Sequence, residues 1–324
     1  MNFFDILAKI LIKLISVIEN KSNFFITFNM RPKYANKYPV FNDIYKNNFS
    51  VGIVITGLIE EKNDFLINSI LIYKKIFKNP CIIVSTWEIK NKKTKLRLED
   101  EKVIIIENKK PKLEGILRIN YQTTHASIGL KKLKEFDIQY AIKIRGDQRI
   151  NSTNALDYLF FIYKKYNHQN EKFSSIVTIS LDTFLFRPYS LCDMFHFGKV
   201  DDLIKYWDIQ DDRKNILSME ITKSIRKFSE EEVCEVFLCR NYLKKVGFAP
   251  DISISTYLEA IKKYFIIIDT ESLDYFWMKY QRKEYFYRNY FAPNSKQINF
   301  SDWLSIREGI LNIDEKIIEQ EFNS

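Results

Sequence analysis

Short runs of β-branched and other apolar residues alternate with amphipathic stretches through the first half of the chain. The runs cover residues 51–57, 80–86, 102–106 and 140–144, and the stretches between them include 60–78 and 118–136. Continuous apolar runs are typical of strands buried on both faces, and apolar positions three and four residues apart indicate helices. This alternation predicts an α/β fold built on a mostly parallel, doubly wound sheet.

The second half is less regular. The pattern predicts strands at 175–180 and 264–269, helices at 201–207 and 229–246, and an aromatic loop ending at Gly198. In the first half, residues 90–97 read as a basic loop. Because no Gly/Ser/Pro-rich linker interrupts the chain, we expect one main domain at 49–270. An amphipathic helix and an irregular lead-in (1–48) would precede it, and a helical, aromatic-rich and basic extension (271–324), packed on the domain, would follow it.

The amino terminus predicts an amphipathic helix. Apolar residues recur at helical spacing through residues 1–18, with Asp5, Lys9 and Lys13 among them. This segment is too short and too charged to span a bilayer. It could lie in a membrane interface, or it could pack on its own domain or on a second subunit.

Composition narrows the class of protein. The chain has 324 residues, and its 50 Lys and Arg exceed its 41 Asp and Glu, for a net charge of +9. Such an excess favours anionic partners without choosing among nucleotide phosphates, nucleic acid and acidic membranes. The four cysteines show no metal or disulfide spacing, and no signal peptide is evident. We therefore expect a reducing, cytoplasmic location.

The most informative segment follows the strand at 140–144, which leads into Arg145, Gly146, Asp147 and Gln148. In an extended chain Arg145 and Asp147 project to the same side. They also lie at the carboxyl end of the strand, where open α/β sheets bind ligands. A guanidinium beside a carboxylate there suits a sugar carried on a phosphate-containing leaving group. The alternative is a surface salt bridge.

Polar residues also end the first two strands. Thr56 and Gly57 end the first, and no glycine-rich phosphate-binding motif follows them. They could meet the base and ribose of a nucleotide, or they could simply end a strand. Ser85, Thr86 and Glu88 flank Trp87 and could hydrogen-bond a base or ribose stacked on the indole.

Further candidates lie on helices and loops. Arg118 could bind a diphosphate, and Gln122 and His125 could line the same pocket, although a lone histidine is more often structural. Asp193 and His196 lie three residues apart, which allows two metal ligands or an acceptor-sugar site. Glu232 belongs to an acidic triplet that suits a helix amino terminus, or it is the general base for an acceptor hydroxyl.

Taken in order, these motifs resemble the WavE family of lipopolysaccharide-synthesis proteins. The matching pieces are residues 52–57 (GIVITG), 85–88 (STWE), 118–122 (RINYQ) with 129–130 (GL), 143–148 (KIRGDQ), and 193–198 (DMFHFG) with 201–203 (DDL). The family looks like a set of glycosyltransferases of the GT-A type. The resemblance therefore implies a GT-A-like fold, a nucleotide-sugar donor and a lipid-linked or oligosaccharide acceptor.

The chain departs from the GT-A pattern at one point. Enzymes of that type commonly hold Mn²⁺ or Mg²⁺ through an Asp-x-Asp motif, and here Arg145 stands at the first Asp position. A divalent ion could still bind through Asp147, donor phosphates and water. Alternatively, Arg145 itself neutralises the leaving diphosphate.

The resulting hypothesis is a glycosyltransferase for lipopolysaccharide or capsule, working at the cytoplasmic face of the inner membrane. Asp193 or Glu232 would be the base in an inverting reaction, His196 would contact the acceptor, and Arg118 and Arg145 would stabilise the leaving nucleotide. One alternative is a single-stranded nucleic-acid-binding protein, suggested by the charge and by residues 279–290. Another is a non-catalytic component of a polysaccharide assembly complex. We expect no nucleic-acid partner.

Overall fold

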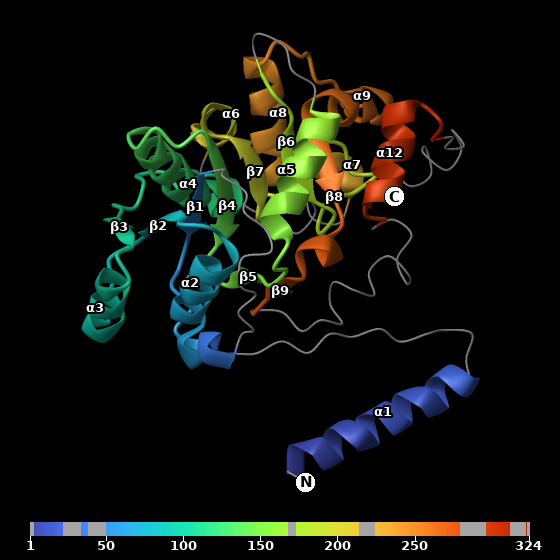
Figure 1. Ribbon diagram of the computed structural model, residues 1–324. Coiled ribbons are helices and arrows are strands. Elements are labelled where there is room, and N and C mark those ends of the chain that lie inside the picture. Colours follow the sequence, from blue (N-terminus) through green and yellow to red (C-terminus); the bar gives the residue numbers. More distant parts are fainter. Residues whose placement is uncertain are drawn as a thin grey trace. The chain divides into compact units, whose positions relative to one another are not determined.

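The computed structural model (Figure 1) describes residues 3–21, 34–37, 50–167, 173–213, 224–278, 296–311 and 322. The chain divides into two compact units, residues 1–38 and 39–324. The predicted lead-in ended at residue 48, whereas the smaller unit ends at residue 38; residues 38–49 lie outside the described part. The two units are treated separately below.

The larger unit is built around a seven-stranded sheet with the order β3-β2-β1-β4-β7-β6-β8. Every strand is parallel to its neighbours except β7, which is antiparallel to both β4 and β6. This arrangement confirms the predicted mostly parallel α/β sheet. The strands are β1 (Val51–Thr56), β2 (Cys81–Thr86), β3 (Ile104–Glu107), β4 (Tyr140–Arg145), β6 (Ile176–Ile179), β7 (His196–Lys199) and β8 (Phe265–Ile268).

The strand order reverses beside β1. From β1 the chain adds β2 and β3 on one side and then places β4 on the other, with Thr56 opposite Arg145 at the carboxyl ends. In an open α/β sheet, a ligand crevice forms at such a switch point, because the connections leave the two strand ends in opposite directions. The fold therefore places the crevice at the residues that the sequence singled out.

Helices cover both faces of the sheet (Figure 1). The Tyr140 ring packs edge-on against Phe160 of α5 (Ala155–Tyr166), whereas Lys143 lies over Trp207 of α6 (Val200–Trp207). Tyr140 and Lys143 are three residues apart on one strand, so they point to opposite faces. The remaining long helices of this unit are α2 (Phe65–Ile76), α3 (Lys92–Asp100), α4 (Ile119–Lys134), α8 (Glu235–Lys245), α9 (Ile254–Tyr264) and α12 (Phe300–Glu308).

Helix α4 lies very close to β1. A Cβ added to Gly129 would come within 2.4 Å of Val54 Cγ1, so glycine is what permits this approach. Close packing holds the amino-terminal end of α4, with Arg118 and Gln122, above the carboxyl ends of β1 and β4.

Three local expectations were wrong. Residues 90–97 include the start of a helix, because the Asn91 side chain accepts hydrogen bonds from the Lys93 and Thr94 amides. The helix expected at 229–246 is two helices, α7 (Ile225–Glu230) and α8, separated by positive φ angles at Glu232 and Cys234. The loop expected to end at Gly198 includes the first three residues of β7, which are buried in the sheet.

A two-stranded ribbon joins the carboxyl-terminal extension to the switch point. In it, β5 (Gln148–Ile150) pairs antiparallel with β9 (Tyr275–Trp277), so Gln148 lies opposite Trp277. Further along the extension, the Trp303 indole donates to the Phe265 carbonyl oxygen of β8 at 3.0 Å. The aromatic and basic stretch 279–290 lies outside the described residues. Short 3₁₀ turns occur at Ala35–Lys37, Lys62–Asp64, Ile116–Arg118 and Thr270–Leu273.

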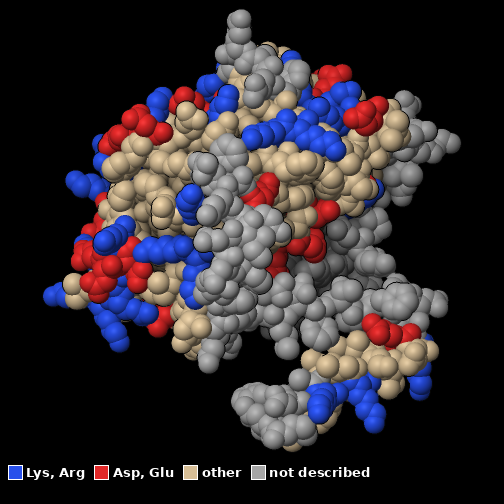
Figure 2. All heavy atoms as spheres, viewed as in Figure 1, with Lys and Arg blue, Asp and Glu red and all other residues tan. Residues whose placement is uncertain are grey.

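The smaller unit contains helix α1 (Phe3–Lys21), as the apolar spacing predicted. Most of its described apolar side chains are solvent-exposed, including Leu11 (50%) and Leu14 (57%). Figure 2 shows the α1 lysines, in blue, gathered along one side of the helix. Among the helices that the structure describes, none combines the length and apolarity needed to cross a membrane.

Candidate functional site

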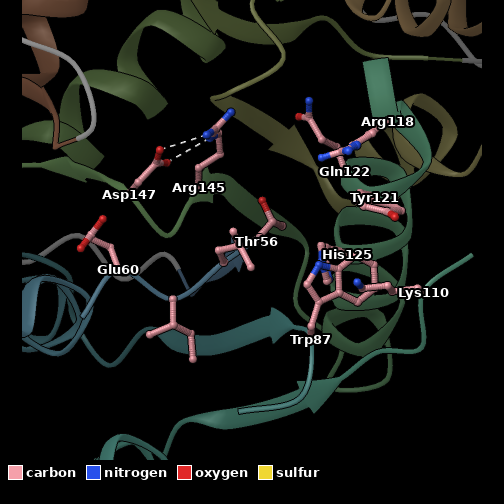
Figure 3. Close-up of a pocket in the computed structure, with 13 residues that line it drawn as sticks. Thr56, Glu60, Trp87, Lys110, Arg118, Tyr121, Gln122, His125, Arg145 and Asp147 are labelled. Atoms are coloured by element: carbon pink, nitrogen blue, oxygen red, sulfur yellow. Dashed lines mark hydrogen bonds and ion pairs between the residues drawn. The ribbon is translucent and has the colours of Figure 1, made fainter. Parts of the chain in front are cut away.

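A cavity of about 530 Å³ opens at the switch point, between the carboxyl ends of the strands and the start of α4 (Figure 3). Six of the predicted donor-binding residues line it together: Thr56, Gly57, Arg118, Gln122, Arg145 and Asp147. Residues far apart in the sequence therefore meet at one surface. We name this space the donor cavity.

The Arg145–Asp147 pair forms one wall of the donor cavity. Arg145 Nε donates to Asp147 Oδ1 at 3.0 Å, and Nη2 donates to Oδ2 at 2.9 Å. The Trp277 indole adds a third hydrogen bond, to Oδ2 at 2.9 Å. A bidentate pair of this kind fixes the guanidinium in one orientation. The pair is 29% and 14% exposed, so it faces the cavity and is more than a surface salt bridge.

The turn that presents this pair requires glycine. A Cβ on Gly146 would lie 2.6 Å from the carbonyl oxygen of Leu58, in the loop after β1. The Gly146 amide also donates to the Thr56 carbonyl oxygen at 2.9 Å. The ends of β1 and β4 are therefore joined directly beneath the cavity.

The cations of the donor cavity favour an anionic ligand. Lys110, Arg118 and Arg145 line it beside only two carboxylates, Glu60 and Asp147. Burial lowers the pKa of Arg145, but the charge of Asp147 and its hydrogen bonds outweigh that effect and raise the pKa above its ordinary value. Arg145 therefore stays charged. Lys110 and Glu60 were not predicted, because nothing in their local sequence distinguishes them from other surface charges.

His125 lies deeper in the same wall. Its Nδ1 lies 2.9 Å from the Asn108 side-chain amide, and its ring centroid lies 3.9 Å from that of Trp87. Burial, together with the charge of Lys143, lowers the His125 pKa to about 4. The ring is therefore neutral at pH 7, and its Nδ1 accepts the hydrogen bond from Asn108.

Four of the residues predicted to bind the donor do not line the cavity: Ser85, Thr86, Glu88 and Gln148. Ser85 and Thr86 are buried behind it, where the Asn108 amide donates to Ser85 Oγ and to the Thr86 carbonyl oxygen. They contact the site through Asn108 and through the Gly57 amide, which donates to the Ser85 carbonyl oxygen at 3.2 Å. Glu88 is exposed and lies outside the cavity lining. Trp87, between Thr86 and Glu88 in the sequence, does line the cavity.

Gln148 and His196 lie in the core. Gln148 is 1% exposed and donates to the Met194 sulfur, so it does not reach a donor. His196 is fully buried on β7, where its Nδ1 accepts from the Trp207 indole at 3.1 Å. His196 therefore lines neither cavity, because residues 196–199 form a central strand and not part of an open loop.

A second cavity, of about 520 Å³, lies on the other side of Arg145 and Gln122, which line both spaces. Asp193 lines it, as does Glu235, which the sequence analysis missed. Glu232 does not: its carboxylate lies 2.7 Å from Arg240 and 3.5 Å from Lys244. Glu235 lines the cavity where Glu232 does not, because helix α8, which carries Glu235, begins three positions after Glu232.

The residues around Asp147 do not fit a divalent ion held by the protein. Both Asp147 oxygens already accept hydrogen bonds from the Arg145 guanidinium, so an ion bound there would lie beside a fixed positive charge. Within the described ranges, no group of three or more His, Cys, Asp or Glu could hold a metal. A Mn²⁺ or Mg²⁺ ion at Asp147 stays a prediction, and no step below depends on it.

Comparison with known proteins identifies the family. A model of the WavE lipopolysaccharide synthesis family matches residues 53–254, which is more than half of the chain. The chain belongs to the WavE lipopolysaccharide synthesis family. The matched range includes Arg145 and Asp147 of the donor cavity and Asp193 of the second cavity. A search of curated protein sequences finds no match.

Solved structures show only distant similarity to this WavE protein. A cytidylyltransferase from Leptospira borgpetersenii is 14% identical, with a TM-score of 0.31 over 66% of this chain and 94% of that one. A mouse xyloside xylosyltransferase 1 is 8% identical, with a TM-score of 0.32 over 68% and 85%. A mannose-1-phosphate geranyltransferase from Thermus thermophilus is also 8% identical, with a TM-score of 0.33 over 68% and 73%. TM-scores this low support no conclusion about the activity of this chain.

Proposed function

We propose that this WavE protein is a glycosyltransferase that moves a sugar from a nucleotide-sugar donor onto a growing lipopolysaccharide or capsule polysaccharide. One observation carries the proposal: the bidentate Arg145–Asp147 pair at the switch point, facing a cavity that also contains Arg118 and Lys110. Fixed cations at the carboxyl ends of parallel strands suit a nucleoside diphosphate. Family membership supports the polysaccharide as the product.

The donor cavity offers a partner for each part of such a donor. The indole of Trp87, held edge-on to Tyr121 at 5.2 Å, provides an aromatic face for the nucleobase. Thr56 and Gly57 would lie near the ribose. The diphosphate would bind between Arg118 and Arg145, and Asp147 would accept hydrogen bonds from ribose or sugar hydroxyls.

The chemistry then depends on fixed charge. Breaking the bond between the sugar and its phosphate leaves negative charge on the departing nucleotide. A guanidinium that is already oriented stabilises that charge without reorganising at the moment of reaction, and such electrostatic terms are usually the largest in catalysis. Asp147 and Trp277 supply the orientation for Arg145.

Helix α1 supports a membrane surface as the place where the acceptor is met. Its exposed apolar residues and its lysines would hold the enzyme at the anionic cytoplasmic face of the inner membrane, where a lipid-linked acceptor is available. An oligosaccharide acceptor is also compatible with the second cavity. The residues that line the two cavities do not indicate a nucleic-acid ligand.

A thermal-shift panel tests the proposal. UDP-, GDP-, CMP- and ADP-sugars are added to the full chain, with and without Mn²⁺. A ligand at about 100 times its Kd stabilises the folded state by roughly 2.7 kcal/mol, which is a shift of several degrees. The shift should be lost in Arg145→Gln and kept in Arg97→Gln, a matched change of an exposed arginine paired with Asp64 on the protein surface.

Three results would count against the proposal. Stabilisation by none of the sugars, in wild type and under any metal condition, would exclude a nucleotide-sugar site. If instead the sugars bind but Asp147→Ala leaves polysaccharide synthesis intact in cells lacking their own copy of the gene, the protein would be a non-catalytic component of the assembly. A salt-dependent gel shift with single-stranded RNA, without any effect of sugars, would favour nucleic-acid binding.

A further inference from the structure

The second cavity is separated from the donor cavity by two side chains. Gln122 and Arg145 line both spaces, so a molecule in one cavity lies across a single layer of side chains from a molecule in the other. Gln122 Oε1 is buried and has no hydrogen-bond partner among the described residues. A buried acceptor of this kind normally has a partner, so Gln122 Oε1 can accept a hydrogen bond from a hydroxyl of a molecule at this boundary.

Two carboxylates from different elements enter the second cavity. Glu235 is the first residue of α8, and its Oε1 accepts a hydrogen bond from Ser190 Oγ at 2.8 Å. Asp193 precedes β7, and its backbone carbonyl accepts from the buried Lys143 ammonium at 2.5 Å. The Glu235 carboxylate is therefore held at a helix end, and the backbone of Asp193 is anchored to the centre of the sheet.

The two carboxylates influence each other. Burial raises the pKa of Glu235, and the negative charge of Asp193 raises it further, to about 7. A group with this proton affinity exchanges protons readily at neutral pH, which is what a general base requires. An ordinary surface glutamate would already be ionised and would be a much weaker base.

We propose that the second cavity binds the acceptor sugar and that Glu235 removes the proton from its reacting hydroxyl. This proposal rests on the proposed transferase function. The acceptor oxygen forms a bond to the anomeric carbon while the bond from that carbon to the donor phosphate breaks. The proton passes to the Glu235 carboxylate, and the bonding electron pair leaves on the phosphate oxygen near Arg145. The product has inverted stereochemistry.

The lining also indicates which acceptors fit. Asp182, Asp193 and Glu235 outnumber the guanidinium groups of Arg145 and Arg187 in this cavity, and the charge of Arg145 is already balanced by Asp147. Phe184, Phe228 and Trp277 add aromatic surface. An uncharged sugar, with apolar C–H faces and several hydroxyls, suits these walls, whereas an acidic sugar would be repelled.

The test measures nucleotide release from the sugar that stabilises the protein, with octyl glucoside, octyl galactoside or anionic octyl glucuronide as the acceptor probe. We expect the uncharged glycosides, but not the glucuronide, to increase release. Glu235→Gln should lower this increase about 100-fold or more, which is the usual contribution of a general base. The donor-induced thermal shift should remain. Glu231→Gln, which changes an exposed carboxylate nearby, is the matched control and should behave as wild type.

The pH profile separates a base from a structural residue. In wild type, acceptor-dependent release should rise tenfold per pH unit below about pH 7 and then level off. Asp193→Asn removes one cause of the raised pKa of Glu235. The rising limb of this variant's pH–rate profile should therefore move to lower pH.

If Glu235→Gln retains the wild-type rate and profile while the donor still binds, the assignment of Glu235 is overturned and the transferase proposal stands. If no donor binds to the wild type, both the assignment of Glu235 and the transferase proposal are overturned.

Discussion

The indole N–H of Trp277 donates to Oδ2 of Asp147 at 2.9 Å, although 130 residues separate them in the chain. The pairing of β5 with β9 makes this contact possible, because it places Gln148 opposite Trp277. The carboxyl-terminal extension thus supplies part of the donor cavity's polar framework. Asp147 accepts three hydrogen bonds, two from Arg145 and one from Trp277.

Replacing Trp277 with Phe should weaken donor binding while leaving the fold intact. The ring and its packing are largely retained, but one hydrogen bond to a charged group is lost, at a cost of about 1.5–3 kcal/mol. We expect the thermal shift given by the stabilising nucleotide sugar to fall correspondingly. Phe276→Leu, the neighbouring residue on β9, is the control. An unchanged affinity in Trp277→Phe would show that Asp147 needs no third donor.

Donor binding should survive removal of metal. Because Arg145 already occupies both oxygens of Asp147, we expect EDTA to leave the nucleotide-sugar thermal shift unchanged. Arg145→Lys should weaken binding about tenfold or more, since an ammonium cannot form the bidentate pair. The measurement is a titration of wild type and variant with and without EDTA. Loss of the wild-type shift in EDTA, restored by Mn²⁺, would instead place an ion at Asp147.

His125 should make the protein sensitive to acid. Its pKa is about 4 when folded, against 6.5 for the ordinary side chain, so between these values the unfolded chain binds a proton that the folded chain does not. The free energy of unfolding should therefore fall as the pH drops from 6.5 to 4, by on the order of 2–3 kcal/mol from this group. Urea unfolding at several pH values measures it.

The variant His125→Asn isolates that effect. Its amide oxygen can accept the hydrogen bond from Asn108 but does not titrate. We expect lower stability at pH 7, because the smaller side chain leaves a cavity, together with a flatter dependence on pH. If the free energy of unfolding changes equally with pH in wild type and variant between pH 6.5 and 4, His125 titrates normally.

Gly146→Ala should disturb the site more than the fold. A methyl group would lie 2.6 Å from the Leu58 carbonyl oxygen, and backbone cannot move aside as a flexible side chain can. Overpacking of this kind costs about 1–3 kcal/mol. The turn between Arg145 and Asp147 would shift away from β1, so donor binding should be lost. Gly198→Ala, where the nearest atom lies 3.8 Å from the added Cβ and φ is likewise not positive, is the control for glycine replacement as such.

Helix α1 should bind anionic vesicles. In the full chain, Leu7→Glu with Leu14→Glu would place charges on the exposed apolar stripe, and we expect sedimentation with phosphatidylglycerol vesicles to fall at least tenfold. Ile12→Glu, off that stripe, should change binding much less. Equal binding by all forms would show that α1 does not contact the membrane and serves another interface.

Local pattern was sufficient for the parts of the fold that repeat a simple period. The runs that became β1, β2 and β4 are mostly apolar, and nearly all of their positions are buried, on both faces of the sheet. Helix α3 was missed because its basic residues form no apolar stripe, so only the cap at Asn91 marks its start. Strand β7 was missed because its four residues are too few to show a period.

The sequence by itself determined the switch-point chemistry. Alternation along an extended chain was enough to put Arg145 and Asp147 on one side at the end of a buried strand. The tertiary structure alone decided which other residues meet there: Trp277 reaches Asp147 through the β5–β9 pairing, Glu235 enters the second cavity, and His196 is enclosed in the core. The reason is physical. Periodicity reports the direction of a side chain relative to its own element, whereas a site depends on how distant elements pack against one another.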